Sequence, residues 1–256
     1  MNQQYDSIIF DMDGVLVNNS SYCTAIQKTV ELVVWNRFKL KKKIPMKYIE
    51  IIKGITGFNN DWDTSYALIR LLGDGVRVER FRKEVQQITP EVRETTEYRK
   101  VKNVFQSMYL GDKLFSQIYG YSAPLKIIKG LISLETLLID LKILAKLASK
   151  YRLGIATSRP RFEALYAVNN LKLSPEYISV EFLIAKEDVT REKPEPDPLL
   201  EVKRRMKVKK PIYIGDTIND VIAAKKANIP CIFVGSQKIG DIQISQTNQL
   251  MEVLYE

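Results

Sequence analysis

The stretch Ser7–Val17, SIIFDMDGVLV, decides how the rest of the chain is interpreted. Its first four residues, Ser7–Phe10, form a short apolar run that is typical of a buried strand. Two carboxylates, Asp11 and Asp13, follow at once, with Gly14 behind them. Enclosed carboxylates repel each other and lose hydration, so they need a compensating charge. A simple turn or a helix cap could also use these residues, but a divalent cation is the first candidate for the missing charge.

The bulk composition describes an ordinary globular chain. It has 256 residues, of which 45% are hydrophobic and 27% are charged, which suits one large domain or two smaller ones with a sizeable core. The sequence contains no histidine. This excludes Ser-His-Asp and Cys-His catalysis and also zinc held by histidine. Acid–base chemistry near neutral pH must therefore use carboxylates, Lys, Tyr, Cys or a metal-bound water.

The cysteines and the apolar segments indicate where the protein works. Cys23 and Cys231 lie far apart and form no metal-ligand or redox motif, which predicts a reducing, cytoplasmic setting. The first residues, MNQQYDS, do not have the pattern of a signal peptide. The most apolar segment, Leu131–Ala148, is interrupted by charged residues, so we expect an amphipathic helix there and no membrane partner.

A change of pattern divides the chain. Helical periodicity dominates residues 18–125, and strand–helix alternation follows. Apolar strands are expected at residues 7–10, 153–156, 181–185, 211–214 and 230–234. Short apolar strands that alternate with helices predict a parallel sheet covered on both faces. The predicted fold is therefore α/β, with a Rossmann-like core from residues 1–17 and 126–256 and an inserted all-helical domain at 18–125.

Polar residues follow three of the expected strands. Asp11 and Asp13 follow the first, Thr157 and Ser158 follow the second, and Asp216 follows the fourth. Ligands of open parallel sheets bind at the carboxyl ends of the strands, near the point where the strand order reverses. We therefore expect these five residues to share one site.

The positive charge is distributed unevenly. The net charge is +9, and residues 18–125 hold 18 Lys and Arg against 11 Asp and Glu, a balance of +7. This suits a small anionic substrate, although a solvated basic surface is an equally simple interpretation. No nucleic-acid-binding motif accompanies the charge, so we expect no nucleic-acid partner. The sequence indicates no particular oligomeric state.

Four motifs together suggest a family. They are DMDGVL at 11–16, Thr157-Ser158, Lys193-Pro194, and GDTIND at 215–220. In these motifs, which stand in the expected order and extend over most of the chain, the sequence resembles the haloacid dehalogenase superfamily on its phosphatase side. The helical segment directly after the first motif resembles the cap domain that many members carry in that position.

The resemblance implies phosphoryl transfer and gives each motif a role. Asp11 is implied as the nucleophile, which forms an aspartyl-phosphate. Asp13 is implied as the general acid and then the general base, which fits a chain without histidine. The hydroxyl of Thr157, the backbone N–H of Ser158 and the charge of Lys193 are implied to bind the phosphoryl oxygens.

The resemblance also implies Mg²⁺ as the cofactor. Its ligands are implied to be Asp11, the backbone carbonyl of Asp13, and Asp216. Asp220, four residues after Asp216, is implied to stand behind these ligands and to orient a water or Lys193.

Two of these motifs also have simpler interpretations. Thr157 and Ser158 precede Pro160, a pattern that is typical of a helix N-terminus, and such an end can itself bind phosphate. Lys193 lies between charged and proline residues, so it could belong to a stiff, solvated loop.

The segment GFNNDWD, at 57–63, is a second feature of interest. We expect it to be a substrate-selecting loop, and the candidate substrate contacts are Asn59, Asn60, Asp61 and Trp62, together with Arg159 from the core. The alternative is an Asx-rich loop that leads into a helix N-cap, with Trp62 packed inside the helical domain. The segment resembles that of a subgroup of haloacid dehalogenase phosphatases whose substrates are not defined.

The sequence thus predicts a Mg²⁺-dependent phosphatase that hydrolyses a small phosphorylated metabolite through an aspartyl-phosphate. A phosphomutase of the same family, such as a sugar-phosphate mutase, would use the same Asp11 chemistry and is the nearer alternative. A non-catalytic binding protein on the same fold is the farther one, because a scaffold has no use for Asp11, Asp13, Lys193 and Asp216 together.

Overall fold

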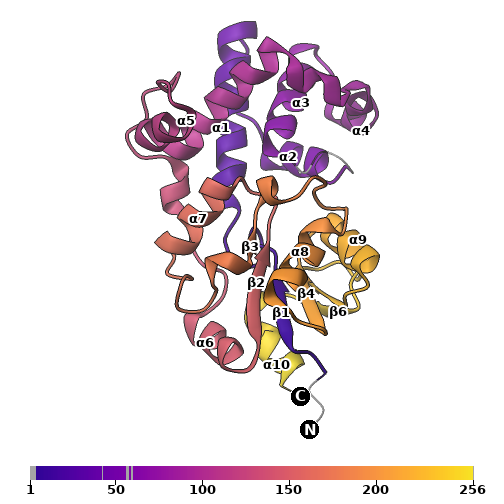
Figure 1. Ribbon diagram of the computed structural model, residues 1–256. Coiled ribbons are helices and arrows are strands. Elements are labelled where there is room, and N and C mark those ends of the chain that lie inside the picture. The colour runs from indigo at the N-terminus through magenta and orange to yellow at the C-terminus, as the bar shows by residue number, and fades with distance from the viewer. Residues whose placement is uncertain (1–3, 42, 56–57, 59, 256) are drawn as a thin grey trace. The chain divides into compact units, whose positions relative to one another are not determined.

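The computed structural model describes residues 4–41, 43–55, 58 and 60–255. The chain divides into two compact units (Figure 1). The α/β unit comprises Met1–Asn18 and Thr136–Glu256, and the helical unit is Asn19–Glu135. Residues 126–135, which the sequence pattern assigned to the α/β core, belong to the helical unit, where Gly130 packs against the backbone of Gly111.

A parallel sheet forms the centre of the α/β unit. Within the described residues it has six strands, in the order β3-β2-β1-β4-β5-β6. They are β1 (Ser7–Phe10), β2 (Arg152–Ala156), β3 (Leu183–Ile184), β4 (Pro211–Gly215), β5 (Cys231–Val234) and β6 (Ile242–Ile244). The predicted α/β, Rossmann-like fold is confirmed. Strand β6 was not expected, because three residues with a central Gln243 are too short a pattern to indicate a strand.

The register of the central strand brings three strand ends level with one another. Phe10, the last residue of β1, pairs with Ile155 of β2 on one side and with Ile214 of β4 on the other. Chain order turns from one direction to the other at β1 and β4, which is where ligands of such sheets bind. The residues that follow these strands therefore begin at one edge of the sheet.

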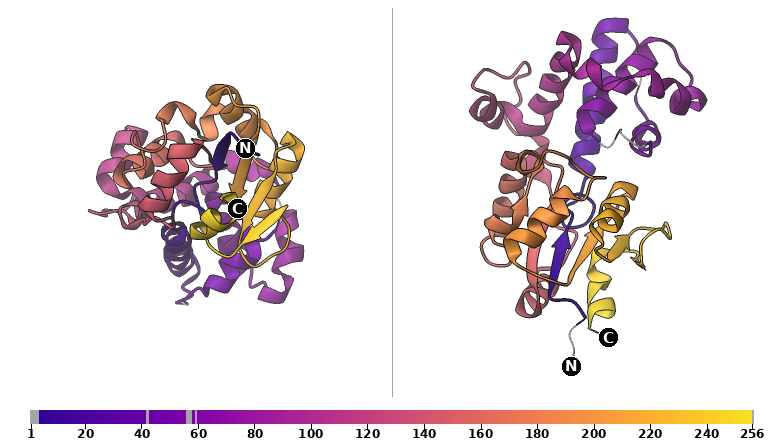
Figure 2. Two further views of the ribbon diagram at one scale, coloured as in Figure 1. Left: turned by 90° about the horizontal axis from the view of Figure 1, so that it is seen from below. Right: turned by 45° about the vertical axis from the view of Figure 1, so that its right-hand side comes forward.

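Helices cover both faces of the sheet (Figure 2). One face packs against α6 (Leu141–Lys150), α7 (Arg161–Asn170) and α10 (Leu250–Leu254), and the other against α8 (Asp197–Met206) and α9 (Ile218–Ala227). Ile8 and Phe10 enter the first core and Ile9 enters the second, as the two-residue period of a strand requires. Burial on both faces explains why the strands read as continuous apolar runs.

Caps set helix ends that periodicity alone misplaces. The apolar pattern of α6 suggests a start near Leu134, but the helix begins at Leu141. Asp140 accepts a hydrogen bond from the Lys142 backbone N–H at 2.8 Å and so acts as the N-cap. The residues before it form a separate 3₁₀ turn, Leu131–Leu134.

The helical unit is built on five α-helices in its described part. They are α1 (Ser20–Phe38), α2 (Met46–Lys53), α3 (Asp61–Gly73), α4 (Phe81–Glu84) and α5 (Thr96–Tyr119). Helix α5 has a kink at Gly111, whose φ of 75° lies in the left-handed region that favours glycine. Seven short 3₁₀ turns complete the described chain: Val78–Arg80, Val85–Gln87, Pro90–Glu94, Leu131–Leu134, Val180–Phe182, Lys186–Asp188 and Thr247–Gln249.

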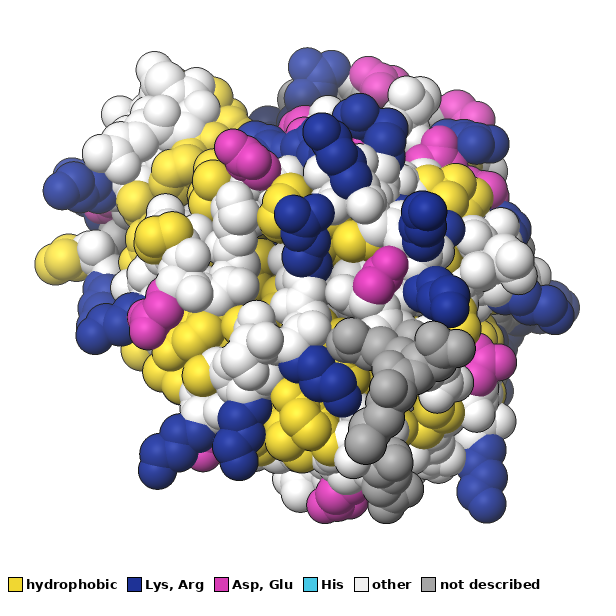
Figure 3. Space-filling view, turned by 60° about the horizontal axis from the view of Figure 1, so that its bottom comes forward, with side chains coloured by type: hydrophobic (Ala, Val, Ile, Leu, Met, Phe, Trp, Pro, Cys, Tyr) yellow, Lys and Arg dark blue, Asp and Glu magenta, His cyan; other side chains and the backbone are white. Residues whose placement is uncertain are grey.

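Charged, uncharged and hydrophobic side chains are mixed on the face that Figure 3 shows. Figure 3 shows Lys and Arg side chains spread over one face and separated by uncharged and hydrophobic side chains. Among the described residues, no helix is both long enough and apolar enough to span a membrane.

Two neighbouring leucines of α8 provide a test of the second core. Leu199 is fully buried against the sheet, whereas Leu200 is 42% exposed. We expect Leu199→Ala to lower the free energy of unfolding by about 2–5 kcal/mol, because it removes packed methyl groups and leaves a cavity. Leu200→Ala should cost less than about 1 kcal/mol. Urea denaturation of the two variants measures both values, and equal losses would contradict this packing.

Candidate active site

The loop after β1 brings two carboxylates into a tight turn. Asp11 is only 7% exposed. The Gly14 N–H donates to the Val17 carbonyl at 2.8 Å and closes the turn. Gly14 has a φ of +74°, and a Cβ at this position would lie 1.9 Å from Asp216 Oδ2. The position thus needs glycine both for its backbone conformation and for the approach of Asp216.

A buried lysine links the loop after β1 to the start of α9. The Lys193 side chain is 4% exposed, and its Nζ lies 2.8 Å from Asp11 Oδ1 and 2.7 Å from Asp220 Oδ1. Nζ also donates to the Tyr213 hydroxyl at 3.0 Å and to the Ala156 carbonyl at 3.3 Å. Lys193 is therefore a paired, interior cation and not a solvated loop residue.

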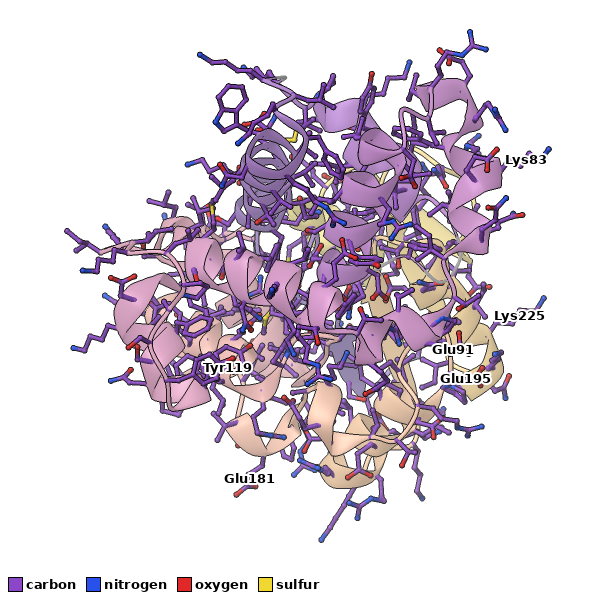
Figure 4. The ribbon with its side chains drawn as sticks, turned by 90° about the horizontal axis from the view of Figure 1, so that it is seen from above. Lys83, Glu91, Tyr119, Glu181, Glu195 and Lys225 are labelled. Carbon is purple, nitrogen blue, oxygen red and sulfur yellow. The ribbon has the colours of Figure 1, made fainter. Side chains whose placement is uncertain are left out.

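The same loop sends a second charged side chain outward. Glu195, two residues after Lys193, lies at the periphery in Figure 4 and pairs with Lys226 at 2.6 Å. The Lys193 side chain is 4% exposed and that of Glu195 is 35% exposed, so two charged residues of the same loop differ sharply in burial.

Asp220 is fully engaged by protein groups. Its Oδ2 accepts from the Thr217 backbone N–H at 3.0 Å and from the Thr217 hydroxyl at 2.5 Å, which forms the capping box of α9. Its Oδ1 accepts from Lys193 and, at 2.6 Å, from the Tyr213 hydroxyl. Asp220 therefore orients Lys193, which is one of the two roles expected for it.

Sequence reasoning missed Tyr213. It lies on β4, inside an apolar run, so its ring was counted with the core. The available signal was the strand period, because Tyr213 and Gly215 share one face of the strand and Asp220 packs against Gly215. A hydroxyl on that face reaches the site.

Asp216 lacks a partner where one is needed. Its Oδ1 is buried and has no hydrogen-bond partner within the described part of the chain. One carboxylate oxygen each from Asp11, Asp216 and Asp220 lie within 4.8 Å of one another. With Asp13, these residues make four carboxylates, against the two cations Lys193 and Arg159. The formal balance of −2 is the charge that one divalent cation compensates, so the donor set fits such an ion.

The titration of the carboxyl groups reflects this imbalance. Burial raises the pKa of the Asp11 carboxyl to about 7, although the Lys193 ammonium opposes the rise. Burial, and then the negative charge of Asp11, raise the pKa of Asp216 well above its ordinary value. Burial also disfavours ionised Asp220, but Lys193 and the hydrogen bonds from Thr217 and Tyr213 outweigh it and lower its pKa. Asp216 is thus the least compensated carboxylate.

The loop after β2 brings three further residues to the same edge. Thr157 is buried, and its Oγ1 accepts from the Arg159 backbone N–H at 3.1 Å. The N-cap of α7 is Pro160, without a side-chain cap bond, so the interpretation of Thr157 and Ser158 as helix caps is wrong. The Arg159 side chain forms an ion pair with Asp13, and its expected contact with the substrate stays a prediction.

In the helical unit, the GFNNDWD segment starts a helix. Asn60 Oδ1 accepts from the backbone N–H groups of Trp62 at 2.9 Å and Asp63 at 3.3 Å, so Asn60 is the N-cap of α3. Asn59 lies outside the described residues. The N-cap interpretation of this segment is therefore correct for Asn60.

The two other candidates in this segment pair with lysines. Asp61 lies 2.7 Å from Lys53 Nζ, and Lys102 Nζ lies 3.8 Å from the centroid of the Trp62 ring. Each pairing gives its side chain a structural role, and substrate contact by Asp61 and Trp62 stays a prediction.

Comparison with known proteins links this site to a family. The sequence profile of haloacid dehalogenase-like hydrolases matches residues 5–228. A phosphoglycolate phosphatase of Escherichia coli K12 is 37% identical over 82 residues, which are 31% of each chain. That of Salmonella typhimurium LT2 is 33% identical over 122 residues, 47% of this chain and 45% of the relative. The matches span less than half of these curated relatives.

Solved structures share the fold over nearly the whole chain. A phosphatase from Thermococcus thioreducens has a TM-score of 0.70 and 24% identity, and the alignment covers 97% of this chain and 98% of that one. A candidate β-phosphoglucomutase from Thermotoga maritima has a TM-score of 0.56 and 21% identity, with 98% of each chain covered. At these identities the likeness concerns the fold alone.

The raised pKa of Asp11 predicts how stability depends on pH without metal. The folded protein holds the Asp11 proton more tightly than the unfolded chain does, so this proton contributes to the free energy of unfolding. The contribution is complete below the ordinary Asp pKa of 3.8 and is lost as pH rises through about 7. The lowered pKa of Asp220 gives its contribution to stability the opposite pH dependence, which is felt only below the ordinary Asp pKa. In EDTA, Asp11→Asn should therefore flatten the fall in unfolding free energy between pH 4 and 7 by about 1–3 kcal/mol. Urea denaturation at several pH values measures the slope.

The exposed Glu252→Gln in α10 serves as the control and should follow the wild-type curve. An Asp11→Asn curve parallel to the wild type would show that the buried carboxyl does not titrate in this range.

Proposed function

Because this chain belongs to the haloacid dehalogenase-like hydrolase family, we propose that it is a Mg²⁺-dependent phosphatase acting on a small phosphomonoester through an aspartyl-phosphate. One observation carries the proposal. Asp11 is buried beside the Lys193 ammonium and near Asp216, whose Oδ1 has no hydrogen-bond partner in the described part of the chain, in a cluster that retains excess negative charge. A purely structural cluster gains nothing from an uncompensated carboxylate, because its burial destabilises the fold.

In the proposed reaction, Asp11 attacks the phosphorus atom and the ester P–O bond breaks. Asp13 gives its proton to the departing oxygen, which leaves as the alcohol. A water then attacks the phosphorus of the aspartyl-phosphate and gives a proton to Asp13. The P–O bond to Asp11 breaks, which releases inorganic phosphate and restores both carboxyl groups.

The residues around Asp11 divide the remaining tasks. We assign phosphate binding to the Thr157 hydroxyl, the Ser158 backbone N–H and the Lys193 ammonium. Thr157 and Ser158 belong to the loop after β2, and Lys193 belongs to the loop between β3 and α8. The contacts from Asp220 and Tyr213 support this role, because they hold the ammonium beside Asp11 before a substrate is present.

We assign metal binding to Asp11, Asp216 and the backbone carbonyl of Asp13. Mg²⁺ bound there neutralises charge on the nucleophile and the phosphate, so that one anion can attack another. Asp220 suits a supporting role better than direct ligation, because both of its oxygens already accept hydrogen bonds.

The substrate proposed is a small anionic phosphomonoester, and phosphoglycolate is the first to test because the curated relatives are phosphoglycolate phosphatases. We assign the role of the family's inserted cap to Asn19–Glu135, because it follows the first motif directly. Its excess of Lys and Arg supports an anionic substrate. Cys23 and Cys231 lie far apart in the sequence and form no metal-ligand or redox motif, which supports a cytoplasmic setting.

A phosphate-release assay tests the activity. With Mg²⁺, we expect the wild type to release phosphate steadily from at least one ester in a panel of phosphoglycolate, phosphoserine, sugar phosphates and nucleotides. EDTA should abolish release, and Asp11→Asn should lower it by at least about 10³-fold because the nucleophile is gone. The exposed Asp74→Asn is the matched control and should keep wild-type activity.

The same assay addresses the two alternatives. The mutase alternative is favoured only by the fold shared with the Thermotoga protein. Conversion of a sugar phosphate to its isomer without free phosphate would support it. A folded wild type that releases no phosphate and forms no isomer would support the binding protein.

Thermal unfolding tests the metal site independently of turnover. Mg²⁺ should raise the Tm of the wild type, because an ion that binds only the folded state stabilises it. Asp216→Asn should raise the Tm of the metal-free protein, since it removes the least compensated carboxylate, and should abolish the further rise with Mg²⁺. An equal Mg²⁺ shift in wild type and Asp216→Asn would argue against this ligand set.

A further inference from the structure

Arg159 and Asp13 form a bidentate ion pair inside the α/β unit. Arg159 Nε donates to Asp13 Oδ2 at 2.8 Å, and Nη2 donates to Oδ1 at 2.5 Å. The arginine side chain is 2% exposed, whereas that of the aspartate is 30% exposed. The guanidinium therefore lies behind the carboxyl group, and the carboxyl group retains access to solvent.

The backbone also fixes the position of Arg159. Its N–H donates to Thr157 Oγ1 at 3.1 Å, and its carbonyl accepts from the Lys186 N–H at 3.0 Å. Helix α7 begins only two residues later, at Arg161. Moving the guanidinium would also break its buried ion pair with Asp13, which is costly. The backbone contacts and the ion pair together hold the Arg159 side chain in one position.

We propose that Arg159 is a positioning residue, which holds the Asp13 carboxyl group in the orientation from which it transfers protons. The inference rests on the proposed phosphatase activity. Two parallel N–H···O bonds from a planar guanidinium fix both the location and the plane of a carboxyl group. A partly exposed aspartate without this support could rotate among several hydrated orientations. Lysine cannot replace the arginine, because an ammonium lacks the planar fork.

Positioning of Asp13 has a kinetic signature that general stability lacks. An ester with a poor leaving group needs the proton from Asp13 when its P–O bond breaks. A good leaving group departs largely without a proton from Asp13. Loss of a positioning residue should therefore slow the first kind of substrate more than the second, whereas partial unfolding or weaker binding slows both equally.

Phenyl phosphate and p-nitrophenyl phosphate are the matched probes, because they differ by one nitro group. The measurement is the first-turnover rate of phenol or p-nitrophenol release, with saturating Mg²⁺, for wild type, Arg159→Gln and Arg159→Lys. We expect release from phenyl phosphate to fall by about 10²-fold or more in both variants, and release from p-nitrophenyl phosphate to fall by less than about 10-fold. The KM values should change by less than about threefold.

The controls separate positioning from folding. Arg205→Lys removes a different arginine fork, which binds Glu201 on the same helix, α8, and Asp188 in the 3₁₀ turn Lys186–Asp188, and should leave both rates unchanged. Arg159→Lys keeps the buried positive charge, so it tests the role if Arg159→Gln does not fold. Asp13→Asn should show the same substrate dependence as the Arg159 variants, and combining it with Arg159→Lys should add little.

The outcomes distinguish the two levels of the proposal. Equal losses with both esters, or a raised KM with unchanged first-turnover rates, would overturn the positioning role while leaving the phosphatase intact. A wild type that releases neither phenol nor p-nitrophenol with Mg²⁺ would overturn the proposed function, and the role of Arg159 with it.

Discussion

A single buried ammonium organises the candidate site. Lys193 comes from a loop, yet its charge lies between Asp11, at the end of β1, and Asp220, in the first turn of α9. Neither carboxylate could remain ionised at that depth without it, and the lysine could not remain charged without them. One cation between two anions still leaves negative charge, and Asp216, whose Oδ1 has no partner among the described residues, adds more. The excess suits the cluster to hold a divalent cation, which would restore neutrality.

The sheet makes this arrangement possible. Parallel strands with level ends place the residues that follow them at one edge, and β1 lies between β2 and β4. The close approach of the loops depends on small residues, above all Gly14, whose missing side chain leaves room for Asp216. The candidate site thus consists of two charged groups at the same edge of the sheet. One is the cluster around Lys193, and the other is the ion pair of Arg159 with Asp13. Lys193 and Arg159 are both deeply buried, and each is paired with at least one carboxylate.

The sequence interpretation was accurate for short local patterns and less accurate where contacts between residues decide the outcome. The bounds of β1 were predicted correctly, because a short apolar run that ends in charge has few alternatives. The start of α6 was predicted too early, because the cap by Asp140 outweighs apolar periodicity in the residues before it. Tyr213 was missed because its place in an apolar run counted it with the core, although the strand period puts it on the face of Gly215. The pairing of Arg159 with Asp13 was not foreseen, because charge type does not reveal which partner a long side chain reaches.

By itself, the sequence determined the α/β class, the strand-terminal carboxylates and the order of the four motifs, because these depend on local patterns and on the shared geometry of parallel strands. Only the tertiary structure decided that Lys193 is buried between two aspartates and that Arg159 is bound to Asp13. These pairings join residues between about 30 and 180 positions apart in the chain. Such distant side chains meet only where packing fixes both backbones, and their electrostatic energies depend on that burial.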